Sequence, residues 1–404
     1  TNGGRGIYAH DGAGAVVVDN VVANGLTAAG VFLIRTGDVT IRNSQMNSDT
    51  VGIWMSDVGQ VLVEDNQFDN HAQSGAVIDR ATAVVVRNTT VSNNAISGLV
   101  ATNLSGTIDL VNLTASDNVE HGSSVRGGSP TLSVTGGLFS GNDLYGIHFD
   151  AVSNATISNV TVDGNGAVDA AAGGIFASTS KPAAVITIQD SVVKNNVAAG
   201  SAGIYVGGTG RAQLERTTVD GNRAVAGGGI SQDQSATAAL TVRQSTFSNN
   251  TATATASSSV AVGGGGARLK TALIENSTFT GNTAGDDGGA IFVDVTAVDV
   301  QLVNSTVTLN SAGREGGGVY NEQSSIYLRG ANSIFAGNTA NSAGGTLAQD
   351  IRGVFGSGSG NLVGDIAGST GVSLTFDLSG TAAALLDPRL APLADNGGTT
   401  LTHN

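Results

Sequence analysis

A glycine followed by alternating apolar residues recurs at a nearly constant spacing along most of the chain. Its positions are Gly6, Gly30, Gly52, Gly75, Gly98, Gly122, Gly146, Gly174, Gly203, Gly229, Gly266, Gly289 and Gly318. The first six intervals are 24, 22, 23, 23, 24 and 24 residues, and the later ones range from 23 to 37. A repeat period of this size is typical of a solenoid, in which each unit packs only against its neighbours. The longer intervals predict insertions at one turn of the repeat.

Each repeat contains three strand-like pieces, which are clearest in residues 75–97, where they read GAVIDR, TAVVVRN and TTVSNN. Because side chains alternate between the two faces of a strand, Ala76, Val84 and Val91 are predicted to point inward. The same positions are apolar in most other repeats and form inward columns. The sequence therefore predicts an all-β fold, a right-handed parallel β-helix of about 13 coils with three short strands each.

Two polar columns support this register. The first consists of asparagines, namely Asn94, Asn118, Asn142, Asn165, Asn196, Asn222, Asn250, Asn282, Asn310 and Asn338. We expect them to adopt the left-handed conformation of a tight turn and to hydrogen-bond from coil to coil. The second consists of outward charges that alternate in sign, namely Asp19, Arg42, Glu64 and Arg87, and later Glu215, Arg243 and Glu275. Opposite charges on neighbouring strands favour parallel, in-register stacking.

Composition excludes several classes of function. The net charge is −14 with acidic residues spread along the chain, so the basic surface expected of a nucleic-acid-binding protein is absent. No run of 18 apolar residues occurs, which argues against a transmembrane helix. There is no cysteine for disulfides or thiolate metal sites. Thr1 is not an initiator methionine and opens no leader, which predicts that an upstream segment has been removed.

The last part of the chain loses the repeat. We predict a β-helix over residues 1–349 and a C-terminal cap or linker over 350–404, where Gly356 to Gly360 and two prolines interrupt any strand ladder. The segment 372–378 is strand-like and is expected to pair on the last coil if 350–404 is a cap.

Several of the repeat motifs resemble those of known bacterial surface proteins. GGAI (288–291), FTGN (279–282) and FAGN (335–338) are similar to the repeats of polymorphic outer-membrane proteins, and the pattern from Gly6 onward is similar to parallel β-helix proteins of the pectate-lyase-like class. The tail LLDPRLAPLADNGGTTLTH (385–403) resembles a segment of large bacterial exported proteins that leads into a surface anchor. The resemblance implies an extracellular or bacterial cell-surface location, and it concerns fold and location rather than chemistry.

Enzymes of the pectate-lyase-like class act on acidic polysaccharides along the first strand of each coil, so the resemblance directs attention to outward residues there. Arg126, His148 and Asp150 are predicted on adjacent coils, with Asp79 nearby, and could act as acid–base groups on a polysaccharide. The alternative is a solvated ion pair. The aspartate signatures of lyases and the histidine motif of epimerases cannot be matched.

Tyr8, Phe32 and Trp54 are predicted to stack on the outer face of the first three coils. Such a stripe would offer a platform for sugar rings or a cover for an adjoining domain. The alternative is that the rings shield the backbone or contact a preceding coil.

Calcium is the metal that the oxygen-rich side chains of this chain favour. The densest acidic group is Asp286 and Asp287, with Asp294 and Asp299 close in sequence. The alternative is an exposed acidic turn without metal.

The function predicted from these patterns is a structural or adhesive β-helix module at the cell surface, associating with itself or with surface glycans, and a non-enzymatic role is favoured. One alternative is a polysaccharide lyase, hydrolase or epimerase that uses the first-strand face. Another is a non-catalytic carbohydrate-binding module. Neither nucleic acid nor membrane insertion is expected.

Overall fold

The computed structural model confirms the predicted fold class, a right-handed parallel β-solenoid of about 13 turns. The structure describes residues 4–12, 14–168, 173–233, 239–255, 263–325, 327–342, 345–347, 349–373 and 375–404, and within these residues there is no α-helix. Two compact units can be distinguished. The first comprises residues 1–187 with 208–210, and the second comprises 188–207 with 211–404.

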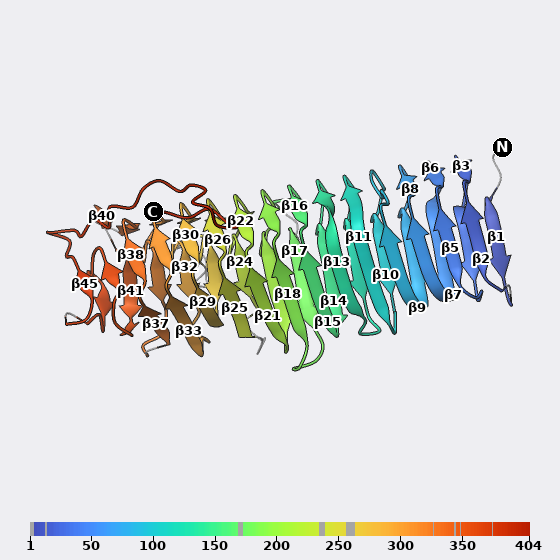
Figure 1. The fold of residues 1–404 in the computed structure, drawn as a ribbon. Coiled ribbons are helices and arrows are strands. Elements are labelled where there is room, and N and C mark those ends of the chain that lie inside the picture. The colour runs from blue at the N-terminus through green and yellow to red at the C-terminus, as the bar shows by residue number, and fades with distance from the viewer. Residues whose placement is uncertain are drawn as a thin grey trace. The chain divides into compact units, whose positions relative to one another are not determined.

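In the first unit the strands form three parallel stacks (Figure 1). The first stack contains β1 (Ile7–His10), β4 (Ala29–Ile34), the starts of β7 (Val51–Glu64) and β9 (Ala76–Arg87), β10 (Leu99–Thr102), β12 (Ser123–Arg126), β14 (Ile147–Val152) and β17 (Ile175–Thr179). The second contains β2 (Val16–Asp19), β5 (Val39–Arg42), the ends of β7 and β9, the starts of β11 (Thr107–Ser116) and β13 (Thr131–Ser140), β15 (Asn154–Ser158) and β18 (Val185–Gln189), whose last two residues belong to the second unit. The third contains β3 (Val22–Asn24), β6 (Gln45–Asn47), β8 (Gln67–Asp69), the ends of β11 and β13, and β16 (Thr161–Asp163).

The second unit also contains three parallel stacks of strands. Its first stack contains β20 (Ile204–Gly208), β24 (Ile230–Gln232), β28 (Ala267–Leu269), β32 (Ile291–Val293), β36 (Val319–Asn321) and β41 (Ile351–Val354). Its second contains β21 (Arg211–Glu215), β25 (Ala239–Arg243), β29 (Thr271–Glu275), β33 (Asp299–Val303), β37 (Leu328–Ala331) and β42 (Gly356–Ser357). Its third contains β19 (Val192–Lys194), β22 (Thr218–Asp220), β26 (Thr246–Ser248), β30 (Thr278–Thr280), β34 (Thr306–Thr308), β38 (Ile334–Ala336) and β43 (Leu362–Val363).

The predicted register is confirmed. In the first stack Ile7 pairs with Val31 and Val31 with Ile53, while in the third Met46 pairs with Phe68. From Val31 onward these inward side chains are fully buried. Each coil thus adds a layer of aliphatic and phenyl groups to one dry core. Burial of this apolar surface, which contributes about 25 cal/mol of free energy per Å², drives the stacking.

The second unit has a fourth short stack that the sequence interpretation did not include. It contains β23 (Arg223–Ala224), β27 (Thr251–Ala252), β31 (Thr283–Ala284), β35 (Ser311–Ala312) and β39 (Thr339–Ser342), with β40 (Gly345–Leu347) antiparallel to β39. Ala224, Ala252 and Ala284 are buried within it. Two-residue strands leave too little alternation to be read from a pattern.

The asparagine column is a continuous hydrogen-bond ladder within each unit. Asn94 Nδ2 donates to Asn118 Oδ1 at 2.9 Å, and Asn118 Nδ2 donates to Asn142 Oδ1 at 2.8 Å, with every member buried. The predicted conformation was wrong, because the left-handed residue is the one before each ladder asparagine, such as Asn93 with φ of 57°. That turn directs the following amide side chain into the coil, where it satisfies buried backbone groups.

Asp49 occupies the ladder position two coils before Asn94. Its Oδ1 accepts a hydrogen bond from Leu26 N at 2.7 Å, as a ladder asparagine would. Within the described structure its buried Oδ2 has no hydrogen-bond partner, and burial raises the pKa of the carboxyl group.

Asp49→Asn is expected to stabilise the protein by about 1–3 kcal/mol at neutral pH, because an amide donor replaces an unsatisfied buried carboxylate oxygen. A raised folded-state pKa means that protonation stabilises the wild type as pH falls, so the difference should shrink in acid. Urea unfolding of wild type and Asp49→Asn from neutral to acidic pH measures this difference in the free energy of unfolding. The exposed Asp143→Asn is the control. Equal stability of Asp49→Asn and wild type at neutral pH would contradict the assignment.

The alternating charge column is also confirmed. Asp19 lies opposite Arg42 with an ion pair of 2.8 Å, and Arg243 lies opposite Glu275 with one of 2.6 Å. These pairs are largely exposed, so each contributes less than about 1 kcal/mol and serves mainly to disfavour a slipped register.

The C-terminal residues add to the second unit in two ways. Strands β41, β42 and β43 pair in parallel with β36, β37 and β38, so coil pairing extends past residue 349, and β44 (Ser369–Thr370) and β45 (Leu378–Ser379) pair with β41 and β43. The final segment then runs back along the third stack (Figure 1). Thr246 Oγ1 donates to Leu401 O at 2.6 Å, and His403 Nε2 lies 3.1 Å from Thr280 Oγ1.

Candidate functional site

The structure brings Arg126, His148 and Asp150 onto adjacent strands, as predicted. Arg126 pairs in register with Asp150, and Ser124 pairs with His148. Arg126 Nε donates to Ser124 Oγ at 2.8 Å, and Ser124 Oγ lies 3.2 Å from His148 Nδ1. No ion pair joins Arg126 to Asp150 among the described residues. The buried Ser124, which sequence reasoning did not select, therefore links the cation to the imidazole.

His148 belongs to a stack of rings that also contains His121, Tyr145 and Phe176. The His148 ring centroid is 4.8 Å from that of His121 and 4.9 Å from that of Phe176. Burial, reinforced by Arg126, lowers the pKa of His148 to about 4, and burial lowers that of His121 to about 3. Both imidazoles are neutral at physiological pH. The cluster is therefore a mainly apolar stack of rings with one polar edge, and its imidazoles are weak bases.

Asp79 does not join this group. The register runs from Asp79 to Thr102 and then to Arg126, which places two coil steps, about 10 Å, between Asp79 and Arg126. Asp79 Oδ1 accepts hydrogen bonds from Thr102 Oγ1 at 2.8 Å and Asn103 Nδ2 at 3.0 Å, and the carboxylate pairs with Arg80. The Asp79 carboxylate is therefore already hydrogen-bonded and ion-paired with residues next to it.

The predicted aromatic stripe is present on the outer face of β1, β4 and β7. The Phe32 and Trp54 ring centroids are 4.5 Å apart with planes within 11°, and Tyr8 lies 5.7 Å from Phe32. The Arg5 guanidinium lies 3.9 Å from the Phe32 centroid. A sugar ring stacks on an aromatic face, and Phe32 and Trp54 cover one face of each other, whereas Tyr8 is tilted against Phe32 and is 48% exposed. The geometry of the stripe favours mutual stacking of coils.

The predicted metal ligands Asp286 and Asp287 are held by an arginine. Arg314 Nε lies 2.9 Å from Asp286 Oδ1 and 3.0 Å from Asp287 Oδ1, and its Nη2 pairs with Asp287 Oδ2. Both carboxylates are buried, and burial raises the pKa of Asp287 to about 6 despite the arginine. The nearby Asp294 pairs with Arg268 at 2.7 Å, and Asp299 with Arg329 at 3.7 Å. Over the described residues no group of three or more His, Asp or Glu side chains is arranged to hold a metal.

A cleft that sequence reasoning missed lies on the first-stack side of the second unit. It has a volume of about 290 Å³ and is lined by Tyr205, Asp233 and Arg268 with small and polar neighbours, namely Ala199, Gly200, Ser201, Ala226, Ser231 and Gln232. Tyr205 Oη donates to Asp233 Oδ2 at 2.7 Å. The cleft forms where Gly and Ala residues leave space between coils. The available signal was that Tyr205 and Arg268 occupy outward positions of first-stack strands and that Asp233 directly follows the strand between them.

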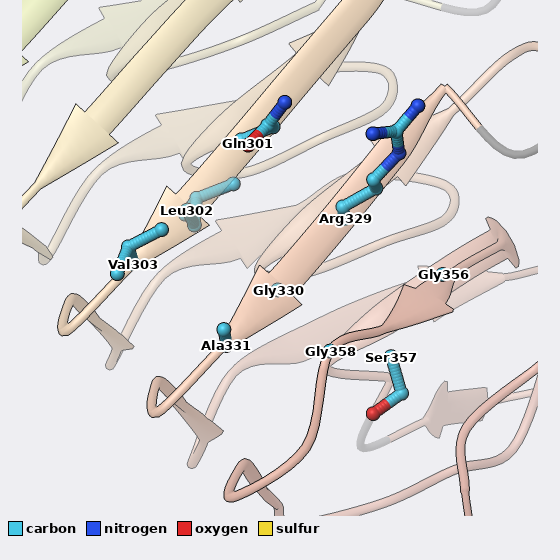
Figure 2. A pocket seen from close by; sticks show the side chains of 9 residues that line it. All are labelled: Gln301, Leu302, Val303, Arg329, Gly330, Ala331, Gly356, Ser357 and Gly358. Atoms are coloured by element: carbon cyan, nitrogen blue, oxygen red, sulfur yellow. The ribbon is translucent and has the colours of Figure 1, made fainter.

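A second hollow lies on the outer face of the second stack and is mostly apolar. Its volume is about 390 Å³, and its lining includes Gly356 and Gly358 of the following coil (Figure 2). Gln301 and Arg329 project from neighbouring strands to one side of it (Figure 2). It brings together no pair of acid and base groups, so it is a poor candidate for chemistry.

Comparison with a family model agrees with this architecture. The model described as a right-handed β-helix region matches residues 1–139, 110–224 and 145–364. Comparison with curated proteins and with solved structures found no match. A search of the described residues for a helix that could cross a membrane found none. Since the matched segments cover far more than half of its length, the chain belongs to the right-handed β-helix family.

Proposed function

We propose that this chain is a non-catalytic, glycan-binding β-helix module displayed outside the cell. The cleft of Tyr205, Asp233 and Arg268 is the observation that carries the proposal. Ligand sites are concave, with an apolar wall and a few placed polar groups, and a volume of about 290 Å³ suits one or two sugar rings.

The residues of the cleft suit a carbohydrate. Tyr205 is half-buried and offers an apolar ring body, and its hydroxyl is oriented by Asp233. The Asp233 carboxylate accepts hydrogen bonds from sugar hydroxyls, while Ser201 and Ser231 can both donate and accept. Rigid strands hold Tyr205 and Ser231 in paired register, so little order has to be gained on binding.

The extracellular part of the proposal rests on the resemblance of the repeats and of the tail to bacterial exported proteins. Labelling intact cells with an antibody against the chain tests it. Signal only after cell lysis would contradict surface display.

Binding is tested by titrating the protein with oligosaccharides of defined sequence in calorimetry. Tyr205→Ala is expected to weaken binding at least about tenfold, because it removes the ring and the hydroxyl together. Trp54→Ala is the matched control, since its ring lies in the self-stacked stripe of the other unit. Product analysis accompanies the titration.

Loss of binding in Trp54→Ala but not in Tyr205→Ala would move the site to the stripe. Release of new reducing or unsaturated ends would make the module an enzyme. Absence of binding to any glycan would overturn the proposal.

A further inference from the structure

We infer that the first unit carries a docking groove for a short polar polypeptide segment of a partner. The groove lies at the corner where β5, β7 and β9 end, and it has a volume of about 580 Å³. Its lining spans three consecutive coils, from Asn43 to Ser92, and consists only of Asn, Gln, Asp, Ser and Thr residues. The inference goes beyond the proposed function, since it concerns the other unit and another class of ligand.

The final segment of the chain, residues 391–404, shows what such a corner can hold, because it occupies the equivalent positions of the repeat in the second unit. Thr400 Oγ1 donates to Gln244 O at 3.1 Å, and Thr246 Oγ1 donates to Leu401 O at 2.6 Å. Gln244 is the corner residue, with φ of 48°, and Thr246 opens β26 two residues later. A corner carbonyl thus accepts a hydroxyl of the segment, and a side chain of the third stack donates to the segment's backbone.

The groove of the first unit offers the same two kinds of group on neighbouring coils. Its corner residues also have left-handed conformations, with φ of 52°, 55° and 49° at Asn43, Asp65 and Asn88. The backbone carbonyls of these three residues accept no hydrogen bond from the described residues. Gln45 follows its corner residue by two positions, as Thr246 does, and it is exposed. Its side-chain amide has no hydrogen-bond partner in the described part of the chain.

The groove is formed before any partner arrives. Asn88 Nδ2 donates to Asp65 Oδ1 at 3.1 Å, and Gln67 Nε2 donates to Asp69 Oδ2 at 2.7 Å. These bonds hold the side chains beside the unused carbonyls and the Gln45 amide, so little side-chain freedom is lost on binding.

The chemistry of the lining favours a polypeptide over a sugar. No aromatic or aliphatic residue of the described structure lines the groove, so a pyranose ring would find no apolar face on which to stack. A polypeptide segment carries a carbonyl or an N–H group at every residue, and hydroxyl side chains add donors. The corner carbonyls repeat about 4.8 Å apart from coil to coil, so a segment laid across the coils can meet them in turn.

A fluorescently labelled synthetic peptide of residues 391–404 is the probe, titrated with the full chain in fluorescence anisotropy. We expect it to bind, and Gln45→Ala should weaken binding about fivefold, the effect of losing one hydrogen bond. Gln45 is exposed, so its replacement should leave the fold intact. Asn24→Ala, which removes an exposed amide of the same stack outside the groove, is the matched control and should bind the peptide as wild type does.

Thr246→Ala separates the groove from the place that the final segment already occupies in the second unit. If Thr246→Ala weakens peptide binding and Gln45→Ala does not, the peptide has only displaced the final segment, and the inference fails. Absence of binding at millimolar peptide would also overturn it. A photoreactive group at the position of Leu401 in the peptide should crosslink to residues 43–92, and crosslinks confined to the second unit would contradict the assignment. Oligosaccharide binding that is lost in Gln45→Ala but not in Tyr205→Ala would assign the groove to glycans instead.

Discussion

Asn142→Leu is expected to destabilise the protein by about 3–6 kcal/mol. The side chain makes four ladder bonds: Nδ2 donates to Asn165 Oδ1 at 2.7 Å and Ala115 O at 3.0 Å, and Oδ1 accepts from Asn118 N and Nδ2 at 3.1 and 2.8 Å. A leucine fills the space but leaves buried donors on one coil and buried acceptors on the next without partners, at about 1–3 kcal/mol each. Hydrogen bonds in a chain also polarise one another, which adds to the loss.

Urea unfolding followed by circular dichroism measures this change. Asn24→Leu is the control, because Asn24 lies exposed on β3 and its replacement should alter the free energy of unfolding by no more than about 0.5 kcal/mol. If Asn142→Leu costs no more than Asn24→Leu, the ladder does not hold the coils together.

Arg314→Met is expected to cost about 3–5 kcal/mol at neutral pH, because it leaves Asp286 and Asp287 buried without a cation. The pKa of Asp287 is already raised to about 6 by burial, and loss of the arginine raises it further. An acid whose folded-state pKa is raised stabilises the fold when protonated, so the cost of the substitution should shrink as pH falls from about 8 to about 5.

Unfolding of wild type and Arg314→Met across this pH range, with and without calcium, tests both interpretations of the acidic pair. The exposed pair Arg243–Glu275 provides the control, and Arg243→Met should cost less than about 1 kcal/mol at every pH. Stabilisation of wild type by calcium would restore the predicted metal site, since a ligand that binds only the folded state raises its stability. A cost for Arg314→Met that grows in acid would contradict the buried carboxylate assignment.

The sequence predicts on which coils most residues of the candidate site lie, but it does not predict which of their side chains contact one another. The period put Arg126, His148 and Asp150 on neighbouring coils, because parallel stacking repeats one register. No sequence pattern singles out Ser124, since a serine on an outer face carries no signal of burial. Only the structure shows that its Oγ accepts a hydrogen bond from Arg126 Nε and contacts His148 Nδ1. The repeat predicts Asp79 near this group because it faces the same side, but each coil step adds about 5 Å and Asp79 lies two steps from Arg126.

In the second unit, too, the sequence predicts positions but not the contacts between side chains. Tyr205 and Asp233 stand in outward positions that the repeat identifies, whereas the cleft between them depends on the small residues of flanking turns such as Gly200. Arg314 lies in a turn one coil after Asp286 and Asp287, and no local sequence pattern predicts that its side chain forms ion pairs with them.

By itself the sequence determined the coil, its register, its buried columns and its asparagine ladder, because period-two alternation and a constant repeat act identically in every coil. Only the tertiary structure decided the fourth stack, the return of the tail along the third stack, and the pairing of Arg314 and Arg268 with buried carboxylates. Those features depend on turns of unequal length and on side chains that reach between coils. The physical reason is that apolar burial is a property of each position, whereas an ion pair or a cleft is a property of where two positions meet.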